Sequence, residues 1–258
     1  MRHFSALIDT DNIGHGFFGR TGGVSVGEYN SLNCGWASGD HMDAITENRR
    51  RAVGRIAPSE TPLVTARQIH SAKVVTVTEP WNKDNAPECD AMVTKQKNIV
   101  LGVLTADCCP ILLADNDNHV IAAVHAGWRG ALAGVVQQTL HAMQAAGANP
   151  AHITAAIGPT IAQDSYEVGD EVLAAFLESD ANNAKFFKPS PHDGRLLFDL
   201  PGFVMRTLAQ SGVNLYENLA MDTYPDQNEF FSYRRTTHSA DGQAPQSYGR
   251  QLSAIVLL

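Results

Sequence analysis

Three side chains with useful chemistry fall within one stretch of this sequence, residues 104–130, LTADCCPILLADNDNHVIAAVHAGWRG. Cys108 offers a thiol, His125 an imidazole and Arg129 a permanent positive charge. Cysteine sulfur and histidine nitrogen suit a zinc ion or a shared proton, whereas a guanidinium suits an anion such as phosphate. This stretch therefore predicts the floor of an active site.

Two short apolar runs, residues 109–115 and 119–125, flank a cluster of turn-forming residues at 115–118. The runs are too short for buried helices, so we expect two strands joined in a hairpin. Cys108 then precedes the first strand and His125 ends the second, which places both at the open end of the hairpin. From these two residues alone, a structural pair without a metal remains as good an interpretation as a metal site.

The segment after His125 has apolar residues at a helical spacing and predicts one helix over residues 131–147. Gly147 is a typical residue for the end of such a helix. Free backbone N–H groups at the helix start, next to Arg129, would attract an anion.

Composition excludes several classes of protein. The chain has 258 residues and a net charge of -8, from 19 Lys and Arg against 27 Asp and Glu, so it lacks the basic surplus of a general nucleic-acid binder. The apolar run from residue 99 to 113 is interrupted by Asp107 and Pro110, which argues against a membrane span. No export signal is visible near the N-terminus, so we expect a cytoplasmic protein. In that compartment free thiols or ligands are the expected state of the four cysteines, Cys34, Cys89, Cys108 and Cys109.

Strand and helix patterns alternate along the rest of the chain without a strict βαβ repeat. Strands are expected within residues 63–78, 89–93, 98–105, 152–161, 213–223 and 251–258, and helices within residues 43–56, 169–179 and 199–212. Residues 181–196 look like a loop, and the arginines of the first helix are expected to face solvent. No internal repeat or linker divides the chain, so we predict one α+β domain over residues 1–258, with mixed sheets covered by helices.

Three further residues are ambiguous when taken alone. Arg20 lies in a glycine-rich segment, residues 14–35, which is either a surface loop or a loop that folds over a substrate. His70 lies near a predicted strand end, where a single histidine is more often an ordinary polar residue than a ligand. Asp107, next to Cys108, could orient a metal ligand or cap a structural element.

Several motifs occur together in a characteristic order: RQIH, TADCCPILL, HAGWRG, IGP followed by YEVG, FFSYRR, and YGR before the last strand. Together they resemble the YfiH-type family, also called the multicopper polyphenol oxidase or laccase-domain family and, more recently, purine nucleoside phosphorylase. The resemblance extends from about residue 15 to residue 258. Two positions depart from the family pattern: Asp222-Thr223 stands where Cys-Thr is usual, and FFGR surrounds Arg20 in place of Phe-Ser-Thr-Arg.

The resemblance implies a fold of mixed sheets sandwiched by helices in α-β-β-α layers. It also implies a zinc ion held by the histidine of the Gln-x-His motif, the cysteine of Ala-Asp-Cys and the histidine of His-Ala-Gly. In this sequence these residues are His70, Cys108 and His125. Arg129 is then the best candidate to hold phosphate, with Arg20 and Arg234 as additions.

The function implied by the resemblance is a zinc-dependent purine nucleoside phosphorylase, acting on adenosine, inosine or methylthioadenosine, with adenosine deaminase activity. Zinc with an open coordination position lowers the pKa of a bound water toward ~7, which suits deamination. The expected partners are a nucleoside and phosphate, with no nucleic acid and no membrane, and the expected state is a monomer.

Three other functions stay open. Cys108 could be the nucleophile of a cysteine-type amide hydrolase that edits peptidoglycan precursors, with His70 or His125 as its base. Copper-dependent oxidation of phenols follows from the older family name, but a multicopper site needs more clustered histidines than this sequence offers. A nucleoside-binding module without turnover is the remaining alternative.

Overall fold

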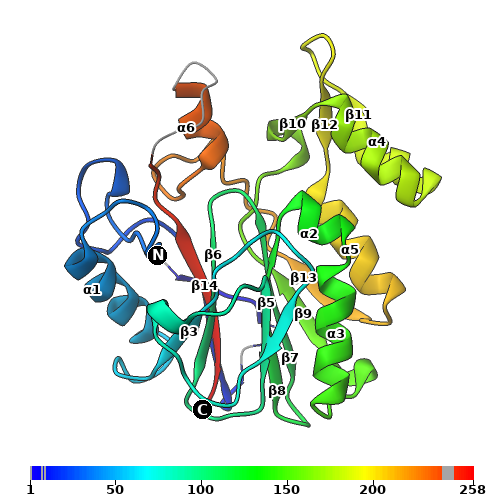
Figure 1. Ribbon diagram of the computed structural model, residues 1–258. Coiled ribbons are helices and arrows are strands. Elements are labelled where there is room, and N and C mark those ends of the chain that lie inside the picture. Colours follow the sequence, from blue (N-terminus) through cyan, green and yellow to red (C-terminus); the bar gives the residue numbers. More distant parts are fainter. Residues whose placement is uncertain (1, 7, 9, 240–246) are drawn as a thin grey trace.

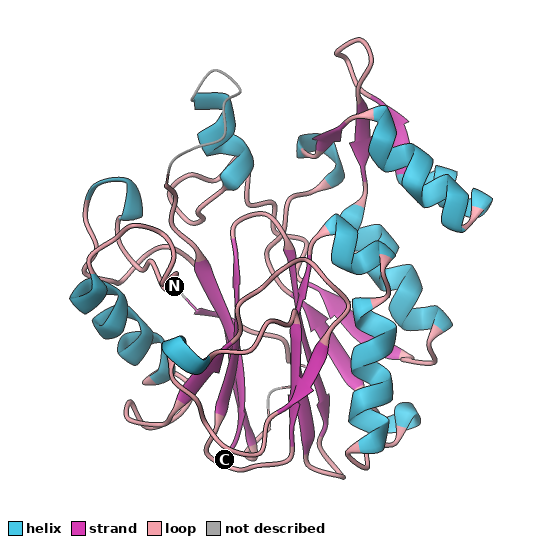
Figure 2. Ribbon diagram, viewed as in Figure 1, coloured by secondary structure: helices cyan, strands magenta, loops and turns pink. Residues whose placement is uncertain are grey.

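Two β-sheets lie face to face, with helices on both outer faces (Figures 1 and 2). The computed structural model describes residues 2–6, 8, 10–239 and 247–258. The order of the layers is helix, sheet, sheet, helix. The predicted α+β class and its α-β-β-α layering are therefore confirmed.

The first sheet contains the last strand of the chain at its centre. Its strands lie in the order β1 (Arg2–His3), β2 (Ile13–Phe18), β14 (Gln251–Leu257), β6 (Val100–Thr105) and β3 (Leu63–Thr65). β14 runs antiparallel to both β2 and β6, whereas β3 runs parallel to β6. The mixed directions agree with the absence of a βαβ repeat in the sequence.

The second sheet is built around the predicted hairpin. Its strands lie in the order β13 (Leu215–Asn218), β9 (Thr154–Ile157), β7 (Cys109–Asp115), β8 (Val120–Ala126), β5 (Ala91–Thr94) and β4 (Val74–Thr76). β7 and β8 pair antiparallel from Cys109–Ala126 to Asp115–Val120, which confirms the hairpin.

The central strands of both sheets are buried on both faces, which explains their continuous apolar runs. In β7, Ile111 and Leu113 face the helices, while Leu112 and Ala114 face the other sheet. Successive side chains of a strand point to opposite faces, so each strand contributes to two apolar layers.

Helices cover the outer faces. α1 (Met42–Val53) packs on the first sheet, and α2 (Trp128–Leu132), α3 (Val135–Ala145) and α5 (Leu200–Gln210) pack on the second (Figure 1). Beyond the second sheet, α4 (Asp170–Ser179) packs against a small sheet of β10 (Glu167–Val168), β12 (Leu196–Phe198) and β11 (Phe187–Pro189). α6 (Tyr233–Ser239) lies above the first sheet. Short 3-10 helices span Gly27–Tyr29, Lys83–Asn85, Pro150–His152, Gln163–Ser165 and Ala181–Phe186.

Two segments predicted as loops contain regular structure. Residues 14–18 belong to the buried strand β2, because Phe17 and Phe18 face opposite apolar layers. The segment 181–196 contains a 3-10 helix and the strand β11, whose pairing with β12 is not local enough for a short pattern to reveal.

Two helix predictions also need correction. The single helix expected over residues 131–147 is two helices, because Gly134 adopts a positive φ of 90° and separates α2 from α3. Arg49 of α1 is buried rather than solvated: its guanidinium donates to the carbonyl oxygen of Cys34 and the hydroxyl of Thr65, and lies over the Trp36 ring.

The four cysteines are free thiols, as expected from the sequence. Within the described part of the chain, every helix is too short or too polar to cross a membrane.

Candidate active site

The three predicted ligands converge at one end of the two sheets. His70 lies on the segment from β3 to β4, Cys108 on the segment from β6 to β7, and His125 near the end of β8. Nε2 of His70 lies 3.7 Å from Sγ of Cys108, and the ring centroids of the two histidines are 4.8 Å apart. All three ligand atoms lie within 4.8 Å of one another.

Asp90, which the sequence analysis did not single out, holds both histidines in place. Its Oδ1 accepts a hydrogen bond from Nδ1 of His125 at 2.8 Å, and its carboxylate also accepts from the backbone N–H groups of Ile69, His70 and Ser71. Because Nδ1 of His125 is occupied, Nε2 is left as the metal-binding nitrogen. A charged residue directly before the buried strand β5 was the signal in the sequence that could have revealed it.

The backbone of His70 is strained, with a φ of 58° in the left-handed region. The hydrogen bonds from consecutive backbone N–H groups to Asp90 stabilise this conformation. The imidazole of His70 is exposed, whereas His125 is buried. One ligand is therefore accessible from solvent and the other is fixed in the core.

The electrostatics of the cluster favour a thiolate. Burial of the Cys108 thiol opposes its ionisation, but the neighbouring His125 and His70 outweigh burial and lower its pKa to about 6. Burial of His125 opposes its protonation, but the Cys108 thiolate and Asp90 outweigh this and raise its pKa to about 9. The thiolate is the form of cysteine that binds metals and acts as a nucleophile.

Gly127 of the His-Ala-Gly motif leaves room for the cluster. A Cβ atom at this position would come within 2.6 Å of Cδ2 of His70 and 3.2 Å of Sγ of Cys108. No side chain fits there without moving a ligand, so the packing of the site requires glycine.

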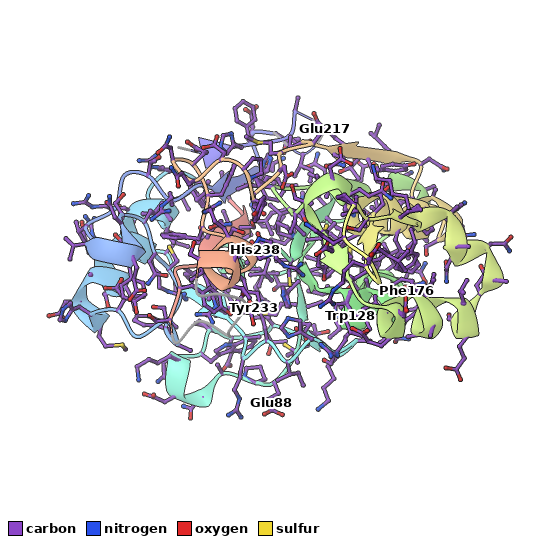
Figure 3. All side chains as sticks on the ribbon, turned by 90° about the horizontal axis from the view of Figure 1, so that it is seen from above. Glu88, Trp128, Phe176, Glu217, Tyr233 and His238 are labelled. Atoms are coloured by element: carbon purple, nitrogen blue, oxygen red, sulfur yellow. The ribbon has the colours of Figure 1, made fainter. Side chains whose placement is uncertain are left out.

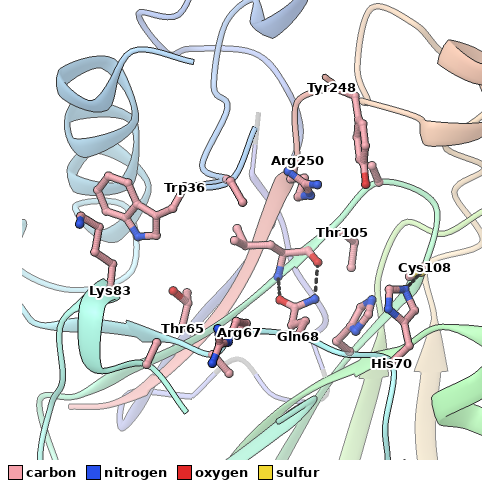
Figure 4. A pocket seen from close by; sticks show the side chains of 17 residues that line it. Trp36, Thr65, Arg67, Gln68, His70, Lys83, Thr105, Cys108, Tyr248 and Arg250 are labelled. Atoms are coloured by element: carbon pink, nitrogen blue, oxygen red, sulfur yellow. Dashed lines mark hydrogen bonds between the residues drawn. The ribbon is translucent and has the colours of Figure 1, made fainter. Parts of the chain in front are cut away.

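Two cavities meet at the ligand cluster. The first, which we call the Trp36 cavity, has a volume of about 350 Å³ and extends from His70 and Cys108 past Tyr248 to Trp36 (Figure 4). Its floor includes Gln68, whose side-chain amide is held in place by two hydrogen bonds to the backbone of Leu104. The cavity therefore combines aromatic walls with a few placed polar groups, as small-molecule sites commonly do.

The second cavity, which we call the Arg129 cavity, has a volume of about 430 Å³ and is lined by Arg129, Arg234, Tyr166, Tyr233 and Trp128. Figure 3 shows Tyr233 of α6 and Trp128 of α2 on the face of the molecule that lies above the sheets. His70, Cys108 and Tyr248 line both cavities, so the ligand cluster lies at their junction.

Two predicted phosphate ligands, Arg129 and Arg234, line the Arg129 cavity. The guanidinium of Arg129 lies 4.3 Å from the centroid of the Trp128 ring, and no other partner is found for it among the described residues. Arg234 donates from Nη1 to the carbonyl oxygen of Glu167 at 2.6 Å. Because α2 is a single short turn, an anion in this cavity would be held by the arginines rather than by a long helix.

Arg20 lies outside both cavities. Its guanidinium donates to the backbone oxygens of Glu28, Asn30 and Gln227 and lies over the Phe231 ring. Folding of the 14–35 segment onto residue 227 directs this arginine away from the ligand cluster, so the structure does not bring it together with Arg129 and Arg234.

Asp107 lines the Arg129 cavity, but its carboxylate is directed at the start of α6. It accepts hydrogen bonds from the hydroxyls of Thr223 and Ser232 and from the backbone N–H of Arg234. Burial raises the pKa of this carboxyl, although these donors oppose the shift. The arrangement matches the capping alternative.

Asp222, the departure from the family pattern, lies apart from the metal ligands. Its carboxylate accepts hydrogen bonds from the backbone N–H groups of Ala162 and Tyr224 and from the hydroxyl of Ser165. It therefore joins the segment after β9 to the segment after β13.

The residues present fit a tetrahedral metal ion with one open position. Zinc–nitrogen and zinc–sulfur bond lengths place tetrahedral ligand atoms about 3.3–3.6 Å apart, close to the 3.7 Å between His70 and Cys108. Asp90 supplies the outer carboxylate that orients a metal-bound histidine. The second acidic group, Asp115, Asp117 and His152, lies at the opposite end of the β7–β8 hairpin and takes no part.

Comparisons with known proteins agree with the motifs. The family described as multi-copper polyphenol oxidoreductase laccase matches residues 14–258. A purine nucleoside phosphorylase of Rickettsia conorii is 39% identical over 213 residues, covering 83% of this chain and 85% of the relative. The purine nucleoside phosphorylase YfiH of Escherichia coli is 38% identical over 219 residues, covering 84% and 86%.

Solved structures share the fold. A Neisseria meningitidis protein superimposes with a TM-score of 0.86 at 33% identity, covering 100% of this chain and 98% of its own. YlmD from Geobacillus stearothermophilus gives a TM-score of 0.83 at 26% identity, covering 98% and 94%. The family match over residues 14–258 and the identity to these relatives show that the chain belongs to the multi-copper polyphenol oxidoreductase laccase family, the YfiH-type family that its sequence resembles.

Proposed function

We propose that this protein is a zinc-dependent purine nucleoside phosphorylase. The observation that carries the proposal is the meeting of two cavities at the ligand cluster: Trp36 and Tyr248 line the first, and the second contains Arg129, which has no acidic partner among the described residues. In phosphorolysis, phosphate attacks C1′ of the ribose from the side opposite the purine. Two cavities on either side of one junction suit this in-line geometry, and relatives named purine nucleoside phosphorylase support the same assignment.

Each part of the substrate has a place in this arrangement. Phosphate binds Arg129 and Arg234, the ribose lies at the junction beside His70 and Cys108, and the purine enters the Trp36 cavity. Arginine suits phosphate because its planar donors match two oxygens at once. The two arginines also offset charge repulsion as the anion approaches.

The reaction is balanced without a further reactant. A phosphate oxygen forms a bond to C1′, the bond from C1′ to N9 breaks, and its electron pair leaves with the purine, which takes a proton from solvent. Holding phosphate and nucleoside together makes this step effectively unimolecular. His70, Cys108 and His125 would hold a zinc ion, which would supply a Lewis acid beside the junction. A thiolate ligand is stable in a reducing compartment, so we place the enzyme in the cytoplasm.

The test is to incubate the zinc-loaded protein with a nucleoside, with and without phosphate, and to identify the products. Free purine and ribose 1-phosphate, formed only with phosphate, are expected. Arg129→Ala should raise the KM for phosphate about tenfold or more, because it removes one charged phosphate contact. Arg195→Ala, on an exposed loop away from both cavities, is the matched control. Absence of phosphorolysis with every nucleoside would sink the assignment.

Adenosine deamination is a second candidate activity. The ligand cluster borders both cavities, so a nucleoside bound in the opposite direction would present its purine ring to the metal. Water then adds at C6, ammonia leaves, and inosine is produced. Inosine formed from adenosine without phosphate, and lost in His125→Ala, would support this activity.

A cysteine hydrolase remains the competing mechanism, favoured by the lowered pKa of Cys108 and its short distance to His70. Its amide substrate would be a peptidoglycan precursor. The two mechanisms differ in their response to metal removal. Chelation abolishes the zinc-dependent reaction but leaves a cysteine nucleophile active, and iodoacetamide should then modify Cys108 with loss of hydrolysis.

Copper-dependent oxidation of phenols is not favoured. Within the described residues one cluster combines histidine and cysteine donors, and it offers a single metal position. A multicopper centre needs several neighbouring groups of histidines.

A further inference from the structure

The Trp36 cavity contains one positive charge without an acidic partner. Arg67 pairs with Glu88 at 3.2 Å, and Lys83 pairs with Asp84 at 2.5 Å. Arg250, which directly precedes β14, has no ion pair or side-chain hydrogen bond with the rest of the described chain. Its charge is therefore available to a ligand.

Two buried polar atoms in the wall of this cavity lack hydrogen-bond partners among the described residues. They are Nη1 of Arg250 and the hydroxyl oxygen of Thr105. β6 and β14 are neighbours, and Thr105 pairs with Gln251, the residue after Arg250, so Thr105 and Arg250 lie at the same end of the first sheet. Figure 4 shows both on the wall of the cavity. Leaving such groups unpaired costs about 1–3 kcal/mol each, so partners from a ligand are expected here.

The guanidinium of Arg250 is held in a defined position. Its Cζ atom lies 4.3 Å from the centroid of the Tyr248 ring. The backbone N–H of Arg250 donates to Asn33 Oδ1 at 3.0 Å, and its aliphatic stem packs beside Gly35. A ring under the guanidinium satisfies its face and leaves its in-plane N–H groups free. Nε and Nη2 are not among its buried atoms, so this edge of the guanidinium can reach two acceptors of one planar ligand.

We propose that Arg250, with Thr105 beside it, recognises the O6 and N7 edge of a 6-oxopurine, so that the enzyme prefers inosine and guanosine to adenosine. This inference rests on the proposed phosphorylase function. A 6-oxopurine offers two acceptors at this edge, which a guanidinium binds in a bidentate manner. Adenine has an amino donor in place of O6, and a donor facing Arg250 is unfavourable. The Thr105 hydroxyl both donates and accepts, so it serves either base.

The same contact would act on the chemical step. As the bond from C1′ to N9 breaks, negative charge spreads over the purine, including N7 and O6. Hydrogen bonds from a cation to these atoms strengthen as the charge develops, so they lower the barrier more than they tighten substrate binding. Arg250 is then a catalytic residue for 6-oxopurines, and its loss should appear in kcat as well as KM.

The experiment compares phosphorolysis of inosine and adenosine by the zinc-loaded wild type, Arg250→Met and Arg250→Lys. Methionine keeps the apolar stem and removes the charge, whereas lysine keeps the charge and loses the bidentate geometry. In Arg250→Met, kcat/KM for inosine should fall about 5- to 150-fold, while the value for adenosine changes less than about threefold. The kcat/KM of Arg250→Lys for inosine should lie between the values of the wild type and Arg250→Met. Thr105→Val should reduce kcat/KM for inosine and for adenosine by similar factors.

Arg51→Met on α1, outside both cavities, controls for the loss of an arginine. Circular dichroism and thermal melting establish that each variant is folded. An equal loss with inosine and adenosine, or a wild type that prefers adenosine, overturns the inference. Calorimetric binding of hypoxanthine and adenine tests the base preference separately from the phosphorylase proposal. If no nucleoside is cleaved, the phosphorylase proposal fails. The base preference stands only if hypoxanthine binds more tightly than adenine and Arg250→Met removes that difference.

Discussion

Asp90 controls the geometry of the ligand cluster through one carboxylate. It fixes the imidazole of His125 and the strained backbone at His70. Burial opposes ionisation of Asp90, but its hydrogen bonds with His125 and Ser71 outweigh burial and lower its pKa to about 2. The residue itself does not contact either cavity. We therefore regard it as a positioning residue, whose effect reaches the chemistry through the two histidines.

At the residue scale, Asp90→Asn should weaken zinc binding about 10- to 100-fold. The asparagine amide lacks the negative charge that pairs with His125. Its NH₂ group would also face N–H donors that now bind the carboxylate. Competition with a zinc indicator measures the change in Kd. Asp193→Asn, on an exposed loop, should bind zinc as the wild type does. An unchanged Kd in Asp90→Asn would show that the outer carboxylate does not tune the metal site.

At the scale of elements, the hairpin β7–β8 presents Cys108 and His125 at one end and is closed by Asp115 at the other. The buried carboxylate of Asp115 accepts hydrogen bonds from the backbone N–H and side-chain amide of Asn118 and from the backbone N–H of Asn149. It thus joins the turn to the segment after α3. The register of the hairpin, which sets the distance between the two ligands, depends on this turn.

Asp115→Ala should lower the free energy of unfolding by about 1–3 kcal/mol near pH 7, because buried donors lose their acceptor. Burial opposes ionisation of Asp115, but the bonds from Asn118 and Asn149 outweigh it and lower its pKa below the usual value. A lowered folded-state pKa means that this contribution is present above the unfolded pKa of about 3.9 and is lost as the pH falls through the folded value.

Urea unfolding at several pH values tests both parts of the Asp115 prediction. The difference between wild type and Asp115→Ala should be largest near pH 7 and should shrink below about pH 4. Asp117→Ala, whose exposed carboxylate contacts His152, is the neighbouring control and should change stability little. A difference that grows on acidification would contradict the assigned direction.

At the scale of the whole molecule, two of the three predicted metal ligands lie where the chain crosses between the two sheets. His70 lies where the chain passes from β3 of the first sheet to β4 of the second, and Cys108 lies where it passes from β6 to β7. A bound metal therefore links two crossovers between the layers, in addition to the apolar core between them. Its binding free energy should contribute to the stability of the whole fold.

Removal of zinc with a chelator should lower the melting temperature of the wild type. At a free zinc concentration ~1,000-fold above Kd, the lost stabilisation is about 4 kcal/mol. Differential scanning calorimetry with and without chelator measures it. In His125→Ala, which lacks one predicted ligand, the chelator should hardly lower the melting temperature. In His141→Ala, on the exposed side of α3, the chelator should lower it as much as in the wild type. A wild type that melts at the same temperature in both conditions would mean that the cluster does not hold a metal.

Local patterns in the sequence determined the hairpin, most other strands and the chemistry of Cys108 and His125, because a strand buried on both faces is a short continuous apolar run whatever its partners are. The motifs added His70 as a ligand through the family resemblance. Arg20, expected as an additional phosphate ligand, instead donates to the backbone carbonyls of Asn30 and Gln227 outside both cavities.

Only the tertiary structure decided which segments meet. The role of Asp90 follows from the pairing of β5 with β8, and the neighbourhood of Thr105 and Arg250 follows from the pairing of β6 with β14. Both pairings join residues far apart along the chain, and strand register is set by packing and by backbone hydrogen bonds rather than by local propensity. The ligand types could be predicted from the sequence, whereas the groups that orient them and the polar wall of the Trp36 cavity could not.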